Sequence, residues 1–334
     1  MRFLLGILAP FKVLGGLYLG WGIGANDSAK IFAPAIATNS IRFRTAITLI
    51  CVFVIAGALA QGHTLYEKYK FDDAPLSPEA ILREATIATT AAAFAVMVST
   101  ILGIPVSTSQ SAVGALIGVT IARSGFASVD FSLLKKMLIC WLATPPIGIV
   151  MAYVLYRLLA PLLPRFLPNF RVRSRFLQLG LIVFGCYEAF ALGANNVVVT
   201  TAPFYQGGMF GPPGPDAVEA RVLAAGIGSL AIALGAITFA KRVMETFGRK
   251  VTVLDPFSAW IVAITTGTTM EVFTLLHVPV SITQAGVGAL IGVGLTKGVG
   301  GVSFGTLRKI ALAWVISPLL AGVLAWLGAL VFAG

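Results

Sequence analysis

Charged residues are scarce in this sequence. They make up 11% of its 334 residues, whereas 57% of the residues are hydrophobic and the mean hydropathy is +0.92. Soluble globular domains carry about 25% charged residues, so this composition excludes a soluble enzyme and a nucleic-acid-binding protein. It predicts a multi-pass protein of the lipid bilayer, which we place in the cell (plasma) membrane, and no nucleic acid is expected as a partner.

Histidine and cysteine are also rare. The chain has two histidines, and its three cysteines, Cys51, Cys140 and Cys186, are scattered through apolar stretches. Structural metal sites and disulfide frameworks need such residues at characteristic spacings. We therefore expect no structural metal, no disulfide and no cofactor.

Long apolar runs, in contrast, are abundant. They extend over 17 to 25 residues, well beyond the ~10-residue alternating segments of a membrane β-barrel, and so predict an all-α polytopic membrane protein. We expect ten membrane segments, at about 3–23, 45–61, 85–103, 106–122, 137–158, 176–198, 221–240, 256–277, 280–296 and 308–332.

The chain contains an internal repeat. Residues 104–119 (IPVSTSQSAVGALIGV) and 278–293 (VPVSITQAGVGALIGV) are identical at 11 of 16 positions. Residues 24–27 (GAND) are echoed by 193–196 (GANN) at a similar offset. We interpret the chain as a tandem duplication, because two unrelated halves would not share these motifs in the same order.

The repeat predicts the organisation of the whole chain. We assign 1–160 to the first repeat, 161–175 to a basic cytoplasmic connection and 176–334 to the second repeat. With about five membrane segments in each half, the second copy must enter the membrane from the opposite side, which gives inverted-topology repeats with broken or re-entrant helices at the centre. A cytoplasmic connection places 14 Lys and Arg inside and eight outside, so both termini are predicted to be extracytoplasmic.

The first candidate site is the pair of Gly-Ala-Asn motifs. Asn26 and Asp27 in the first motif, and Asn195 and Asn196 in the second, place polar side chains inside apolar segments, where they are costly. Because Asn and Asp favour helix caps over helix interiors, we expect the helix to break here and expose its backbone to a cavity. The alternative is that they cap a loop at the membrane edge.

The second candidate site is the pair of Pro-Val-Ser motifs. Each places a proline and hydroxyl residues directly before an apolar helix, where Ser or Thr can cap the free amides. Such a helix start, with its positive dipole end, favours an anion. We expect the two starts to converge near the bilayer midplane, the alternative being a proline kink whose hydroxyls bond to the backbone. The glycines that follow at four-residue spacing (Gly114, Gly118, Gly288 and Gly292) are predicted to serve close helix packing.

The third group consists of acidic residues within apolar or motif segments: Asp27, Glu188 and Glu271. A buried carboxylate must pair with a cation, bind a metal ion or become protonated, so all three are candidate sites for a coupling Na⁺ or H⁺. Asp27 is the first choice because it lies in a motif. Glu188 and Glu271 are alternatively ion-pair partners for Lys12 or Lys30.

Together, these motifs resemble the inorganic phosphate transporter (PiT) family in its compact prokaryotic form. The resemblance implies cation-coupled uptake of inorganic phosphate, driven by Na⁺ in some members and by H⁺ in others. It also implies a substrate site formed by residues of the motifs, namely Asn26, Asp27, Ser107, Thr108, Ser109, Gln110, Asn195, Asn196, Ser281, Thr283 and Gln284.

Three departures from the family pattern leave alternatives open. Asn196 replaces an acid of the second motif, Gln110 and Gln284 stand where phosphate-type members often carry His, and residues 187–196 resemble the sulfate permease branch. A sulfate permease on the same scaffold is therefore the main alternative. An intramembrane lipid-diphosphate phosphatase is a remote one, because the motifs hold no Ser/His/Asp set or cationic clamp, and we expect no enzyme. A homodimer is compatible with the sequence.

Overall fold

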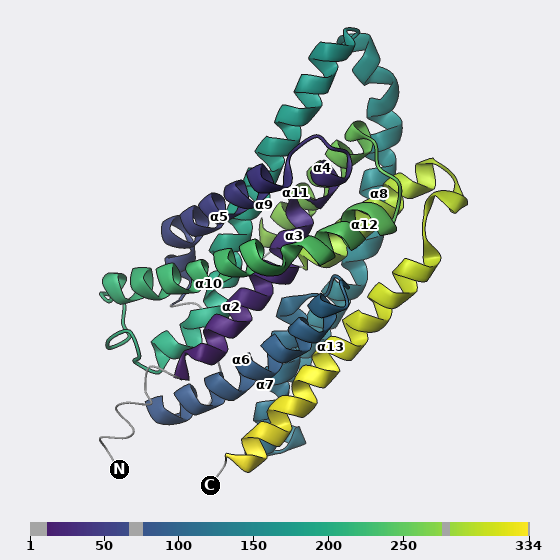
Figure 1. Cartoon of the computed structure of the whole chain (residues 1–334). Coiled ribbons are helices and arrows are strands. Elements are labelled where there is room, and N and C mark those ends of the chain that lie inside the picture. Colours follow the sequence, from purple (N-terminus) through teal and green to yellow (C-terminus); the bar gives the residue numbers. More distant parts are fainter. Residues whose placement is uncertain (1–11, 67–75, 276–280, 333–334) are drawn as a thin grey trace.

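The computed structural model describes residues 12–66, 76–275 and 281–332, which form a bundle of helices (Figure 1). Six helices in this part of the chain are long and apolar enough to cross a membrane. They lie within α5 (Phe43–Ala60), α6 (Pro78–Ile101), α8 (Phe131–Phe166), α9 (Phe170–Gln206), α10 (Val218–Glu245, continued by a π-helix to Lys250) and α13 (Phe304–Val331).

The remaining α-helices of the described residues are not among these six. They are α2 (Leu14–Asn26), α3 (Ser28–Ile31), α4 (Ala33–Ala37), α7 (Thr108–Ser124), α11 (Pro256–Leu275) and α12 (Ile282–Thr296). At 1.5 Å per residue, the 17 residues of α7 and the 15 of α12 span only about 26 and 23 Å, less than the ~30 Å hydrocarbon core. These lengths are compatible with the predicted helices that start or stop within the membrane, and that placement stays a prediction.

The two Gly-Ala-Asn motifs differ: the expected break is absent from the second motif, whereas at the first motif α2 ends at Asn26 and α3 begins at Ser28. The second motif lies inside α9, which runs without interruption from Phe170 to Gln206. In the first, Asp27 keeps right-handed helical angles (φ −74°, ψ −44°), and the chain leaves the helical path only at Phe32 (φ −98°, ψ 5°). The chain keeps its helical direction through Asp27 because the Asn26 side chain bonds to groups on other elements and does not compete for the backbone of its own helix.

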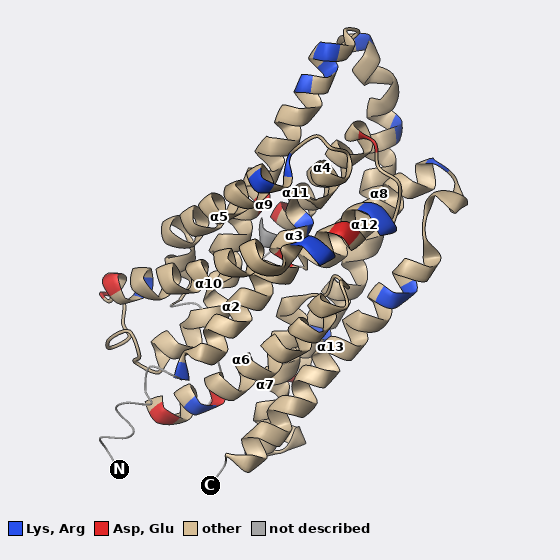
Figure 2. Ribbon diagram, in the orientation of Figure 1, with Lys and Arg blue, Asp and Glu red and all other residues tan. Residues whose placement is uncertain are grey.

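The connection between the repeats is shorter than expected. α8 continues to Phe166 and α9 begins at Phe170, so only residues 167–169 of the predicted 161–175 connection are non-helical. Asn169 caps α9, its side-chain oxygen accepting hydrogen bonds from the amides of Arg171 and Val172. Figure 2 shows Lys and Arg gathered around this turn.

The short helices of each half pack on the last helix of the other half (Figure 1). α7 lies against α13, and α12 lies against α8. Glycine makes both contacts close: a Cβ on Gly114 would lie 2.2 Å from the Pro318 carbonyl oxygen, and one on Gly288 would lie 2.4 Å from that of Pro145. Gly118 and Gly292 make equivalent approaches one turn further on. The predicted packing role of these four glycines is confirmed.

The two helices that carry the Gly-Ala-Asn motifs, α2 and α9, also pack on helices of the other half. α2 packs on α10, and α9 packs on α5. A Cβ on Gly24, in the first motif, would lie 1.8 Å from the Ile232 carbonyl oxygen, and one on Gly193, in the second, would lie 2.0 Å from that of Val54. Corresponding residues of the two repeats thus make corresponding contacts across the middle of the molecule.

Candidate functional site

Asn26 joins the first motif to the non-helical stretch between α6 and α7. Its Nδ2 donates to Thr100 Oγ1 at 2.9 Å and to the Ile104 carbonyl at 3.2 Å, and its Oδ1 accepts from the Val106 amide at 3.0 Å. Asn26 is fully buried. Its amide therefore satisfies the backbone of the non-helical stretch between α6 and α7, which has no helical partners of its own.

Lys30 is the centre of a buried polar cluster. Its Nζ donates to Asp27 Oδ1 at 2.6 Å, to the Val106 carbonyl at 2.6 Å and to the Thr283 hydroxyl. The Thr283 hydroxyl in turn contacts the Val106 carbonyl at 2.7 Å and Asp27 Oδ1 at 3.4 Å. The Asp27 and Lys30 side chains are only 4% and 1% exposed, so a complete ion pair is enclosed by the protein. The cluster unites the first motif with Val106 in the stretch before α7 and with Thr283 at the start of α12.

The starts of α7 and α12 are built alike. Ser107 caps α7, accepting from the Gln110 amide at 3.4 Å, and Ser281 caps α12, accepting from the Gln284 amide at 3.4 Å. Because Thr283 reaches the carbonyl of Val106, the two starts converge in space. The predicted serine caps and the convergence of the two helix starts are confirmed. Pro279 and His277 lie outside the described residues.

Several polar atoms near these helix starts have no hydrogen-bond partner among the described residues. They include the hydroxyl of Thr108 and the Oε1 atoms of Gln110 and Gln284. All three residues are buried. The hydroxyl of Ser109 lies 3.0 Å from that of Ser107. The helix starts therefore retain polar atoms that a ligand could engage.

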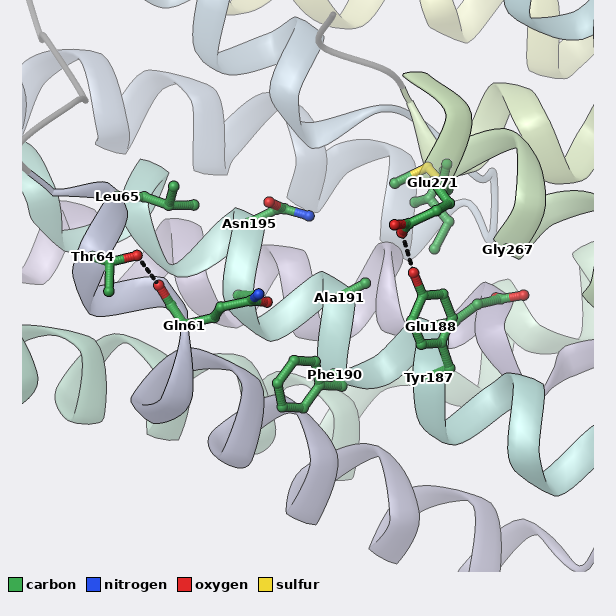
Figure 3. Close-up of a pocket in the computed structure, with 13 residues that line it drawn as sticks. Gln61, Thr64, Leu65, Tyr187, Glu188, Phe190, Ala191, Asn195, Gly267 and Glu271 are labelled. Atoms are coloured by element: carbon green, nitrogen blue, oxygen red, sulfur yellow. Dashed lines mark hydrogen bonds between the residues drawn. The ribbon is translucent and has the colours of Figure 1, made fainter. Parts of the chain in front are cut away.

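A cavity of about 410 Å³ lies beside this cluster (Figure 3). Asn195 and Glu188 line it from α9, Gln61 lines it from the end of α5, and Ile282 lines it from the start of α12. Tyr187 donates a hydrogen bond to Glu271 within it, as the dashed line in Figure 3 shows. The cavity connects the second motif with the start of the second short helix.

Glu188 borders two cavities. Besides the large one, it lines a second cavity of about 10 Å³, room for roughly one water molecule, whose wall also includes Lys30 and Thr266. Glu188 is 4% exposed, and its Oε1 has no hydrogen-bond partner in the described part of the chain. It is thus a buried carboxylate oxygen placed between the open cavity and the central cluster.

The predicted residues fall into three places. Asn26, Asp27, Ser107, Thr108, Ser281 and Thr283 belong to the central cluster and the two helix starts. Asn195, Glu188 and Glu271 line the large cavity, whereas Asn196, half-buried on α9, does not. Gln110 also lines a separate apolar groove between α7, α8 and α13.

Lys30 is a central residue of this cluster, although the sequence predicts it only as a partner of Glu188 or Glu271. The structure pairs it with Asp27. The available signal was its spacing: residues three apart on a helix lie on the same face, so Asp27 and Lys30 were already neighbours.

This bundle, with short helices starting at a buried polar cluster, defines the class of polytopic helical membrane transporters. The phosphate transporter family matches residues 23–325, and the chain belongs to that family. It is 26% identical to a candidate phosphate permease of Pyrococcus furiosus, over 94% of this chain and 93% of that protein. It is 28% identical to one of Methanocaldococcus jannaschii, over 95% of each chain.

A solved structure shares the fold. The structure described as the sodium-dependent phosphate transporter superposes with a TM-score of 0.80, over 98% of this chain and 99% of that one, at 22% sequence identity. The all-α membrane architecture predicted from the sequence is therefore confirmed.

Proposed function

We propose that this protein is a cation-coupled symporter of inorganic phosphate and that it works as a carrier without enzymatic activity. The observation that carries the proposal is the convergence of two serine-capped helix starts on one buried polar cluster. Membership of the phosphate transporter family supports phosphate as the substrate. The name of the structural relative, a sodium-dependent phosphate transporter, supports coupling to a cation.

We place the phosphate site between the two helix starts, with the large cavity as its approach. An oxyanion is favoured there because free amides and hydroxyls donate to it and the helix dipoles are positive at this end. Ser107, Thr108 and Ser109 would donate from α7 and Ser281 from α12. Thr283 would donate only once its hydroxyl turns away from the Val106 carbonyl. Asn195 would contact phosphate on its way in, since it lines the cavity.

We assign coupling to the buried carboxylates. Of the three predicted acids, Asp27 is paired with Lys30 and Glu271 accepts a hydrogen bond from Tyr187, whereas the Oε1 of Glu188 has no partner among the described residues. An unpartnered buried carboxylate oxygen favours binding of a cation or a proton.

We further propose that the two halves are inverted-topology repeats that work by alternating access in the plasma membrane. The exchanged packing of α7 on α13 and of α12 on α8 supports this arrangement. The basic residues around the turn between α8 and α9 favour a cytoplasmic turn, which leaves both termini extracytoplasmic.

The test of the proposed function is uptake of radiolabelled phosphate into proteoliposomes under an imposed Na⁺ or H⁺ gradient, with sulfate measured in parallel. We expect phosphate to accumulate against its own gradient and excess sulfate to leave this uptake unchanged. Glu188→Gln is expected to reduce gradient-driven accumulation at least tenfold while phosphate exchange without a gradient persists. Sulfate accumulation in place of phosphate would overturn the substrate assignment.

A further inference from the structure

The ammonium of Lys30 lies in a cage of oxygen atoms. Its three N–H donors are used by a carboxylate (Asp27), a backbone carbonyl (Val106) and a hydroxyl (Thr283). The carbonyl belongs to the non-helical stretch before α7, and the hydroxyl belongs to the first turn of α12. Carboxylates, unwound backbone carbonyls and hydroxyls at broken helices are also the ligands with which transporters bind alkali metal ions.

We propose that Lys30 is a tethered cation: its ammonium permanently occupies a position that a sodium ion would otherwise fill. The inference goes beyond the proposed function, because it concerns which cation this cage holds and does not depend on the transported anion. In this role Lys30 neutralises Asp27 and connects the first motif to Val106 and Thr283. Sodium therefore has no place in this cage in the wild-type protein.

The comparison of the two repeats supports this assignment. The positions in the second repeat that correspond to Asp27 and Lys30 are Asn196 and Val199, so the acid and the base are either both present or both absent. Within each motif the charge is thus balanced by the chain itself. An Asp27 without Lys30 would be a buried, uncompensated carboxylate, which requires an added cation or a proton.

A different result is expected if Lys30 only forms a structural ion pair with Asp27. In that case the cage has no affinity for a metal ion, and removing the lysine leaves a defect that no salt can repair. If Lys30 replaces a bound ion, shortening its side chain creates an empty oxygen cage, and sodium should refill it and restore stability by mass action.

The experiment compares apparent Tm values of purified protein, without phosphate, in NaCl and in choline chloride of equal concentration. Lys30→Ala is expected to unfold at a lower temperature than wild type in choline chloride, and sodium should raise its apparent Tm saturably by about 3 °C or more. Lys30→Ser serves as the second variant if alanine prevents purification. The double variant Asp27→Asn with Lys30→Ala is the matched control, which should lose the sodium response because the charged ligand is gone.

Two results would overturn the proposal. One is a folded Lys30 variant whose apparent Tm is the same in sodium and in choline. The other is a wild-type protein that shows saturable sodium stabilisation that Asp27→Asn removes and Glu188→Gln leaves intact, since sodium would then occupy the cage beside Lys30. The wild-type arm can overturn the proposal on its own, whereas the sodium response of a lysine variant is what distinguishes the tethered cation from a simple ion pair. Because phosphate is absent throughout, failure of the proposed transport activity does not affect the result.

Discussion

Asn26→Ala is expected to destabilise the protein strongly and to abolish uptake. The change removes three hydrogen bonds and leaves the buried Val106 amide and the part-buried Ile104 carbonyl without that partner. Each orphaned buried group costs about 1–3 kcal/mol, so we expect a loss of about 3 kcal/mol or more. Because these groups position the start of α7, surviving folded protein should also transport poorly. Apparent Tm in detergent and phosphate uptake in proteoliposomes measure the two effects.

The matched control is Asn195→Ala, the same residue at the corresponding position of the second repeat. Asn195 is exposed in the large cavity, so its loss should change the apparent Tm little. It should instead raise the phosphate concentration needed for half-maximal uptake. If Asn26→Ala unfolds at the same temperature as wild type, the hydrogen bonds of Asn26 to the stretch before α7 do not stabilise the centre of the molecule.

Gly24→Ala is expected to be the second large effect. The added Cβ would lie 1.8 Å from the Ile232 carbonyl oxygen and 2.8 Å from the Ala236 amide nitrogen, both backbone atoms of α10. Neither atom can move without displacing its helix, so α2 and α10 must separate. Overpacking of this kind costs about 1–3 kcal/mol and occasionally more, and contact with backbone places this case at the upper end. The yield of monodisperse protein and the apparent Tm report the result.

Gly305→Ala provides the control for this substitution. It makes the same chemical change in the first turn of α13, where an added Cβ meets no heavy atom within 4 Å. Alanine also favours helix over glycine, so the apparent Tm should stay the same or rise slightly. Equal losses in the two variants would show that the close approach at Gly24 is not the cause.

Much of the fold could be predicted because its signals are local or repeated. Ser107 and Ser281 cap α7 and α12 as their position before an apolar helix predicts. The four-residue spacing of Gly114 and Gly118 marks the face of α7 that meets α13. Because the motif occurs twice, each prediction applies at two positions, and Ser281, Gly288 and Gly292 make contacts that correspond to those of Ser107, Gly114 and Gly118.

The centre of the site was harder to predict because its contacts join distant parts of the chain. The intrinsic preference of Asn for helix ends agrees with the end of α2 at Asn26, but it does not identify the partners 74 and 80 residues away that bind the side chain. The cage around Lys30 likewise depends on Thr283, 253 residues away. Sequence patterns identify such residues as polar and costly to bury, but not which acceptor each of them reaches.

The exchanged glycine contacts have a consequence for the way this protein folds. Each half presents its short helix and its motif helix to partners that only the other half provides, as with Gly114 on Pro318 and Gly288 on Pro145. A single half, expressed alone, would leave these helix faces without a partner. The packing of the first half is therefore completed only after the second half has been synthesised.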